Sequence, residues 1–310
     1  MKFIRGKPPL LFFFSVLFFS CLSAQDVTDE TVSAAPSETP DSAVCQDSPL
    51  AFGNPSGAEP DLSVPENYLM EKNTFVLSYN ASSLCPNWVA WHLCPADFGT
   101  AARSNSFRPD SSLPEGWYRV KKSDYRFNVY GFDRGHVCPS ADRTFSKEDN
   151  ESTFLMTNMI PQAPDLNRIV WRDLEMFERS LAESGNELYI FAGPAGSGGK
   201  SARGEFSEIP VAAENPEGGE GLAVNVPAWS WKIMLVLPFG DDDSARIGEE
   251  TDVISVCVPN VQGCASVGSW EQYLTTVDYI EEITGFDFFS ALPDELETVL
   301  ESVVYSPDKN

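Results

Sequence analysis

Short runs of apolar residues, several alternating with polar ones, recur along the chain and end at glycine, proline or polar clusters. Such runs are typical of β-strands. In one of them Trp88, Ala90 and His92 fall on the same face, which favours a structural role for this histidine. The predicted strands cover residues 75–79, 88–93, 188–191, 229–237 and 253–258.

Residues 166–183 carry apolar side chains at helical spacing instead, and Gly185 follows as a stop signal. Two more helices are predicted: residues 276–284, which end before a glycine, and residues 293–303, which begin with Pro293 in the first turn. Helices and strands do not alternate regularly, so the pattern favours an α+β fold over a doubly wound α/β fold.

The first 24 residues are predicted to be a secretory signal. A basic start precedes a 13-residue apolar stretch, residues 10–22, and cleavage is expected after Ala24. The stretch is shorter than the ~18 residues of a membrane span. An uncleaved anchor, or a lipoprotein acylated on Cys21, stays open as an alternative. We therefore expect a secreted or periplasmic protein.

Residues 25–50 are rich in Ser, Thr, Pro and acidic residues and are predicted to form a disordered spacer. Residues 51–310 are expected to form one folded domain. The apolar runs in the chain are too short for a protein with several membrane spans. The oligomeric state stays open.

Six cysteines follow the predicted signal, and an even number in an exported protein implies disulfides. Cys257 and Cys264 flank a turn and are candidates for a local bridge. Cys85 and Cys94 bracket a strand that spans ~30 Å when extended, so they should not pair with each other. The chain has no Cys-x-x-Cys and only two histidines, which argues against a Cys/His zinc site.

Two segments resemble ligand-binding loops but lack the required residues. Residues 193–201 would be a phosphate-binding loop only if glycine stood at Pro194, so a flexible surface loop is predicted. The three aspartates 241–243 lack the spacing of a calcium loop and are predicted to form a solvated turn.

Residues 130–139 contain the candidate chemistry. An imidazole such as His136 is a natural base near neutral pH. Arg134 offers a bidentate grip for phosphate oxygens, and Gly135 between them allows close backbone approach or an unusual φ. Taken alone, this Asp-Arg-Gly-His segment fits a surface turn equally well.

A second segment, residues 158–167, leads into the predicted helix 166–183. On that helix Asn167 and Glu175 are eight residues apart, which is only ~80° from the same direction. Their oxygens suit a hard cation such as Mg²⁺. Asn167 could equally cap the helix, and both roles are compatible.

These segments, in this order, resemble the DNA/RNA non-specific endonucleases, also called ββα-metal or His-Me finger nucleases, which include secreted bacterial nucleases and mitochondrial endonuclease G. The resemblance covers most of the chain after about residue 52. It rests on Asp-Arg-Gly-His at 133–136, Asn-Met-Ile-Pro-Gln at 158–162, Leu-Asn-x-x-x-Trp-x-x-Leu-Glu at 166–175, and weaker matches at 87–92, 103–110, 226–232 and 278–289. It implies a central antiparallel sheet flanked by helices, with a ββα-metal active-site motif.

The resemblance also implies the roles of three residues. His136 would be the general base that activates water, Asn167 the ligand of one Mg²⁺ or Mn²⁺, and Glu175 a carboxylate that contacts the metal's water. The activity implied is hydrolysis of phosphodiester bonds in DNA and RNA, bound through their backbone phosphates.

Phosphate binding would fall on Arg134 and, with looser spacing, on Arg103, and Asn158 matches a further active-site asparagine. Arg168 departs from the family, where many relatives have glutamine, and is expected to face substrate or solvent.

The net charge of −25 opposes a nucleic-acid substrate, because phosphate affinity comes from Lys and Arg. Residues 100–145, however, hold eight basic and five acidic residues, so positive charge is concentrated around the candidate site. Substrate binding is therefore expected to be weak and strongly salt-sensitive. Two alternatives are a decayed nuclease scaffold that serves as an acidic binding protein, and a nuclease for non-nucleic phosphodiesters.

Overall fold

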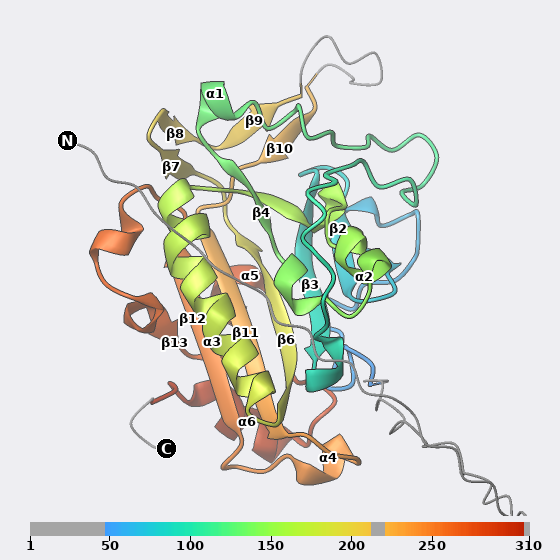
Figure 1. Cartoon of the computed structure of the whole chain (residues 1–310), viewed down its shortest axis with the longest axis vertical. Coiled ribbons are helices and arrows are strands. Elements are labelled where there is room, and N and C mark those ends of the chain that lie inside the picture. Colours follow the sequence, from blue (N-terminus) through green and yellow to red (C-terminus); the bar gives the residue numbers. More distant parts are fainter. Residues whose placement is uncertain (1–46, 212–220, 307–310) are drawn as a thin grey trace, which may run out of the picture. The chain divides into compact units, whose positions relative to one another are not determined.

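A seven-stranded antiparallel sheet forms the centre of the fold, in the order β1-β2-β3-β6-β11-β12-β13 (Figure 1). The structure, a computed structural model, describes residues 47–211 and 221–306. The predicted signal and most of the predicted spacer lie outside the described residues. The strands of this sheet are β1 (Tyr68–Glu71), β2 (Val76–Asn80), β3 (Cys85–Leu93), β6 (Asn186–Ala195), β11 (Trp229–Pro238), β12 (Asp252–Pro259) and β13 (Leu274–Thr275).

All five predicted strands are present, and the α+β class is confirmed. Alternate side chains of each strand point to opposite faces, so the sheet separates two apolar cores. In β3, Val89 and Trp91 join one core, whereas Trp88 and Ala90 join the other. Because all four are buried, both faces of the sheet are covered.

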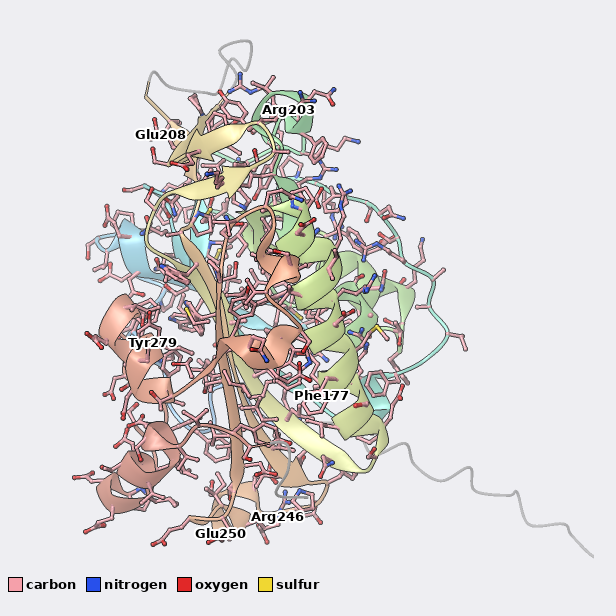
Figure 2. All side chains as sticks on the ribbon, turned by 90° about the vertical axis from the view of Figure 1, so that its left-hand side faces the viewer. Phe177, Arg203, Glu208, Arg246, Glu250 and Tyr279 are labelled. Carbon is pink, nitrogen blue, oxygen red and sulfur yellow. The ribbon has the colours of Figure 1, made fainter. Side chains whose placement is uncertain are left out.

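Helix α3 (Arg172–Glu183) covers the first face, where Leu174 is fully buried. The C-terminal helices α5 (Val277–Thr284) and α6 (Asp294–Ser302) contribute to the second core. Figure 2 shows Phe177 of α3 and Tyr279 of α5 on opposite sides of the sheet. Pro293, predicted inside the last helix, precedes its first residue as the N-cap.

The predicted helix 166–183 is not a uniform α-helix. Residues Leu166–Trp171 form a π-helical turn, and the α-helix begins only at Arg172. Single π-turns are rare and are frequent at functional sites. The π-turn therefore changes the direction of Asn167 relative to Glu175 from the one expected on a uniform α-helix.

Two further strands, β4 (Asp133–His136) and β5 (Met159–Gln162), form an antiparallel pair beside the start of α3. Their register places His136 opposite Met159. Two strands followed by a helix are the ββα arrangement implied by the resemblance. The remaining short elements are α1 (Phe127–Tyr130), α2 (Lys147–Ser152), α4 (Asp243–Arg246), β7 (Gly199–Ser201), β8 (Gly204–Phe206), β9 (Glu208–Pro210) and β10 (Ala223–Asn225).

Two loop predictions were wrong. The glycine-rich residues 193–201 are not a flexible loop, because β6 continues to Ala195 and β7 then forms a hairpin with β8. The aspartates 241–243 are not simply a solvated turn, because Asp243 is buried and its carboxylate accepts a hydrogen bond from the Tyr189 hydroxyl. In both places a partner distant in sequence contributes: β11 pairs with the end of β6, and Tyr189 contacts Asp243.

The predicted Cys257–Cys264 bridge is also wrong. Both are free thiols, as are Cys85 and Cys138. Cys94 is disulfide-bonded, and none of these four is its partner. Among the described residues, no helix is both long and apolar enough to cross a membrane.

Candidate active site

A pocket of about 300 Å³ lies where β4, the segment after it and the start of α3 meet. It is lined by Arg103, Arg134, His136, Pro139, Ser140, Ala141, Asn167, Arg168, Arg172 and Glu175. Five of the six predicted site residues therefore share one cavity, although their positions span more than seventy residues of sequence. The sixth, Asn158, does not line it.

His136 is the last residue of β4 and is buried against two aromatic rings. Its ring lies edge-on to Phe154, with centroids 4.7 Å apart, and 5.5 Å from Phe107. Nε2 is buried and has no hydrogen-bond partner among the described residues. Burial, together with the positive charges of Arg103 and Arg134, lowers the pKa of His136 to about 3. The imidazole is therefore neutral, which is the form that can accept a proton.

Gly135 lets β4 lie close to β5. A Cβ atom at this position would stand 2.0 Å from Oε1 of Gln162, and the next two nearest atoms also belong to that side chain. The reason for the glycine is thus close approach, the first of the two alternatives that the sequence left open. The close approach of Gly135 to Gln162 sets the position of β4, the strand that ends in His136.

Asn167 is the second residue of the π-helical turn, and its side chain does not cap the helix. Its Nδ2 donates to Oδ2 of Asp133 at 3.1 Å. Oδ1 accepts no hydrogen bond from the described residues, so the carbonyl oxygen remains for a cation. Asp133 also accepts two hydrogen bonds from Arg168, at 2.7 and 2.6 Å. Arg168 lines the pocket and is exposed, as expected, and it is also paired with an acid.

Glu175 lies on α3, above a buried charge network. Desolvation raises its pKa to about 7, against the lowering effect of nearby Lys232. Lys232 and Glu178 form an ion pair in which both side chains are fully buried. The Lys232 ammonium also lies 5.1 and 5.2 Å from the ring centroids of Trp91 and Trp171.

The two predicted phosphate-binding arginines are held by aromatic rings. The guanidinium of Arg134 lies 4.6 Å from the centroid of Phe107, and that of Arg103 lies 5.0 Å from Phe154. Arg103 also donates to Oγ of Ser140 at 2.6 Å. Since these rings also contact His136, one aromatic cluster positions the base and both cations.

Asn158 is fully buried beside the pocket. Its Oδ1 accepts from the Cys138 amide and its Nδ2 donates to the Cys138 carbonyl, both at 2.9 Å. A third bond joins Nδ2 to the carbonyl of Thr153. Asn158 therefore positions the backbone two residues after His136.

Sequence reasoning missed Asp133 and Arg172 as site residues. Asp133 belongs to the Asp-Arg-Gly-His segment, but nothing in the spacing shows that it orients Asn167. Arg172 lines the pocket from the first turn of α3 and is paired with Asp173 at 2.7 Å. Five residues along an α-helix turn ~140° away from Asn167, so the spacing gave no signal for Arg172.

Known proteins resemble this chain over most of its length. The family model for DNA/RNA non-specific endonucleases matches residues 58–295. A nuclease from Nostoc sp. is 45% identical over 255 residues, covering 82% of this chain and 85% of the relative. Human mitochondrial endonuclease G is 27% identical over 223 residues, covering 71% and 69%.

Among solved structures, the EndoG/EndoGI complex contains a chain of similar fold. Its TM-score is 0.61 at 22% identity, and the match covers 81% of this chain and 95% of that chain. The fold, the match of the family model to most of the sequence and the Nostoc relative lead to one conclusion: the chain belongs to the DNA/RNA non-specific endonuclease family and is an endonuclease.

Proposed function

We propose that this endonuclease hydrolyses phosphodiester bonds in both DNA and RNA, with Mg²⁺ as its cation and Mn²⁺ as an alternative. The observation that supports this most is the single pocket that contains His136, Asn167, Glu175, Arg103 and Arg134. A base, oxygen donors for a cation and two fixed guanidinium groups around one cavity suit a phosphate group.

In this proposal His136 is the general base. Neutral imidazole takes a proton from water as the water attacks phosphorus in line. The buried, unpartnered Nε2 supports this role, since a nitrogen already bonded to protein would have to give up that bond first. Phe107 and Phe154 hold the ring in place, so little reorganisation is needed.

The donor set fits a hard divalent cation. Asn167 would hold it through Oδ1, with its amide fixed by Asp133, and Glu175 would bind the water around it. When bound, such a cation stabilises the negative charge that develops on the phosphate oxygens and the leaving group. All these donors are oxygens, which is the preference of Mg²⁺.

Arg134 and Arg103 would bind the phosphate oxygens through charge-assisted hydrogen bonds. Because these contacts are made to the phosphate backbone of the nucleic acid and not to base edges, cleavage is expected to be independent of the nucleotide sequence. The surrounding chain carries a net charge of −25, so we expect weak substrate binding. The Michaelis constant should rise steeply between about 50 and 200 mM salt, and a salt-independent constant would contradict this part of the proposal.

The test is a plasmid-nicking assay of wild type and His136→Ala, each with Mg²⁺ and with chelator. We expect a loss of at least about 100-fold, since a positioned base contributes ~10²–10⁴ in rate. Circular dichroism and Mg²⁺ titration should be unchanged in the variant. Lys147→Ala, at a position exposed on α2, is the control for general surface changes. Unchanged turnover in His136→Ala refutes the assignment.

The same assay separates the alternatives. A decayed scaffold that only binds would show no magnesium-dependent nicking by the wild type. An enzyme specialised for other phosphodiesters would cleave small diesters in a substrate panel while leaving DNA and RNA intact. Export remains part of the proposal, and fractionation of the producing cells, with labelled lipid to detect acylation of Cys21, tests it.

A further inference from the structure

Four potential metal ligands meet away from the active-site pocket: Asp47, His92, Glu187 and Asp243. One imidazole nitrogen and one oxygen from each carboxylate all lie within 4.8 Å of one another. The residues come from the start of the described chain, β3, β6 and the first residue of α4. His92 packs 4.5 Å from the ring of Tyr189, in the second core, so the cluster is on the sheet face opposite α3.

The inner part of this cluster is buried. His92 is 4% exposed, Glu187 0% and Asp243 8%, whereas Asp47 is exposed. Nε2 of His92 lies 3.2 Å from Oε2 of Glu187. At this hydrogen-bond distance Nε2 can donate to Glu187, which leaves Nδ1 of the same ring for a metal.

The charges around the cluster do not balance. Its three carboxylates face Arg246, which contacts Oε1 of Glu187 and Oδ1 of Asp243. Arg143, which donates to the backbone of His92, is already paired with Asp97 at 3.1 Å. One guanidinium against three carboxylates leaves two negative charges, which one divalent cation neutralises.

One buried atom also lacks a partner. Nδ1 of His92 has no hydrogen bond within the described chain. An unsatisfied buried polar atom is destabilising unless something binds it. When a histidine binds a metal, its other ring nitrogen usually donates to a carboxylate, as Nε2 can here to Glu187.

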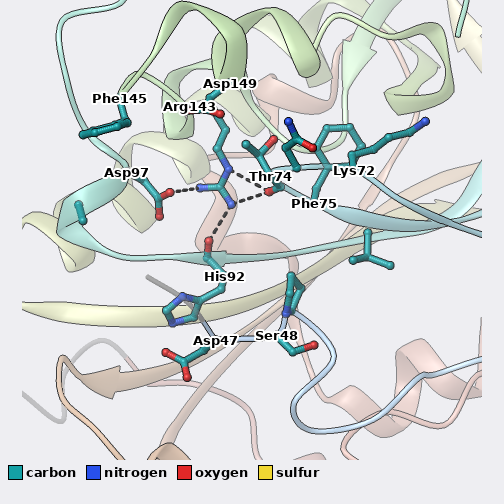
Figure 3. A pocket seen from close by; sticks show the side chains of 14 residues that line it. Asp47, Ser48, Lys72, Thr74, Phe75, His92, Asp97, Arg143, Phe145 and Asp149 are labelled. Atoms are coloured by element: carbon teal, nitrogen blue, oxygen red, sulfur yellow. Dashed lines mark hydrogen bonds and ion pairs between the residues drawn. The ribbon is translucent and has the colours of Figure 1, made fainter. Parts of the chain in front are cut away.

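We propose that Asp47, His92, Glu187 and Asp243 form a second divalent-metal site, selective for Zn²⁺ over Mg²⁺. One imidazole with carboxylates suits zinc, whereas Mg²⁺ prefers oxygen ligands and retains its water. A pocket of about 440 Å³ lined by Asp47 and His92 gives the ion an entry path (Figure 3). The ion would have a structural role, tying the chain at Asp47 to β3 and β6. The sequence lacks a Cys/His zinc pattern because these ligands meet only in the folded chain.

The test uses full-length protein carrying Asn167→Ala, which removes the proposed catalytic ligand. After chelator dialysis, ZnCl₂ is titrated by calorimetry, and melting temperatures are measured with and without zinc. We expect one zinc site, with at least tenfold weaker binding in Asp47→Asn and His92→Gln. Zinc should raise the melting temperature of the parent and not of these variants. Asp61→Asn, at another exposed aspartate, is the matched control and should bind as the parent does.

The proposal is overturned if the Asn167→Ala protein binds no zinc, or if Asp47→Asn and His92→Gln bind it as tightly as the parent. Circular dichroism checks the fold. If His92→Gln fails to fold, the exposed Asp47→Asn variant decides alone. The proposed nuclease function is measured separately, with Mg²⁺ and wild-type protein, so either idea can fail without the other.

Discussion

Replacing Gly135 by alanine tests whether the β4–β5 contact positions His136. The added Cβ would stand 2.0 Å from Oε1 of Gln162, whereas ordinary contacts begin near 3.4 Å. One of the two groups must therefore move by about 1.4 Å. Gln162 is fully buried and its amide donates to Ser230, so it cannot simply turn into solvent. We expect β4 to shift, and the base with it.

The magnitude follows from that displacement. A misplacement of ~1 Å can cost ~10²-fold in rate, and overpacking a core costs ~1–3 kcal/mol. Gly135→Ala should therefore lose about 100-fold in kcat/KM while the protein remains folded. The assay is cleavage of a fluorescent duplex under single-turnover conditions, with urea unfolding to measure stability.

A second substitution tests whether the loss of activity comes from the displacement of His136. The three atoms nearest to the added Cβ all belong to the Gln162 side chain beyond its own Cβ. Gln162→Ala removes all of them, so the Gly135→Ala/Gln162→Ala protein should regain most of the activity. Full activity in Gly135→Ala, or no recovery in the double variant, would show that this contact does not position the base.

Three further predictions concern the residues around the site and the C-terminal helix. Asp133→Ala frees the amide of Asn167 and should weaken Mg²⁺ binding ~10–100-fold by calorimetry; unchanged affinity would contradict the orienting role. Lys232→Met leaves Glu178 buried without its partner and should lower the free energy of unfolding by about 3–5 kcal/mol, whereas adding Glu178→Leu should recover most of it. The pKa of Glu301 is raised to about 8 by burial and neighbouring acids, so the folded state keeps a proton that the unfolded chain loses above about 4.5. Stability should fall as pH rises between these values, and Glu301→Gln should flatten that slope and add about 1–3 kcal/mol at pH 8; equal slopes in urea titrations would refute this.

The two histidines show how one residue type acquires different environments. His136 ends a strand beside arginines and an open pocket. His92 lies in the second core against Glu187 and Tyr189. The prediction that His92 is structural fits its burial, while the proposed zinc site adds a ligand role that spacing along the chain could not suggest.

The acidity of the chain does not extend to the candidate site. Its pocket is lined by four arginines and one glutamate. Two of these arginines are paired with Asp133 and Asp173, so Arg103 and Arg134 carry the charge that is free for phosphate. Local field near a site matters more than net charge at physiological ionic strength, where screening extends only ~8 Å.

The sequence predicts five of the strands, the main helix and the residue types of the candidate site. Alternation and helical spacing report burial directly, because each side chain's face follows from its position in a regular element. The order of the motifs pointed to His136 and Asn167 as candidate site residues. Related proteins share such motifs because the same local backbone geometry needs the same residues. The central antiparallel sheet was implied by resemblance and is now seen in its full strand order.

The other features depend on contacts that form only in the folded chain. The burial of Asp243 against Tyr189 and the pairing of β6 with β11 each depend on partners far along the chain. The orienting role of Asp133 likewise appears only when β4 and the start of α3 meet. Hydrogen bonds and ion pairs act over a few ångströms in space, and sequence separation does not record which side chains will come within that reach.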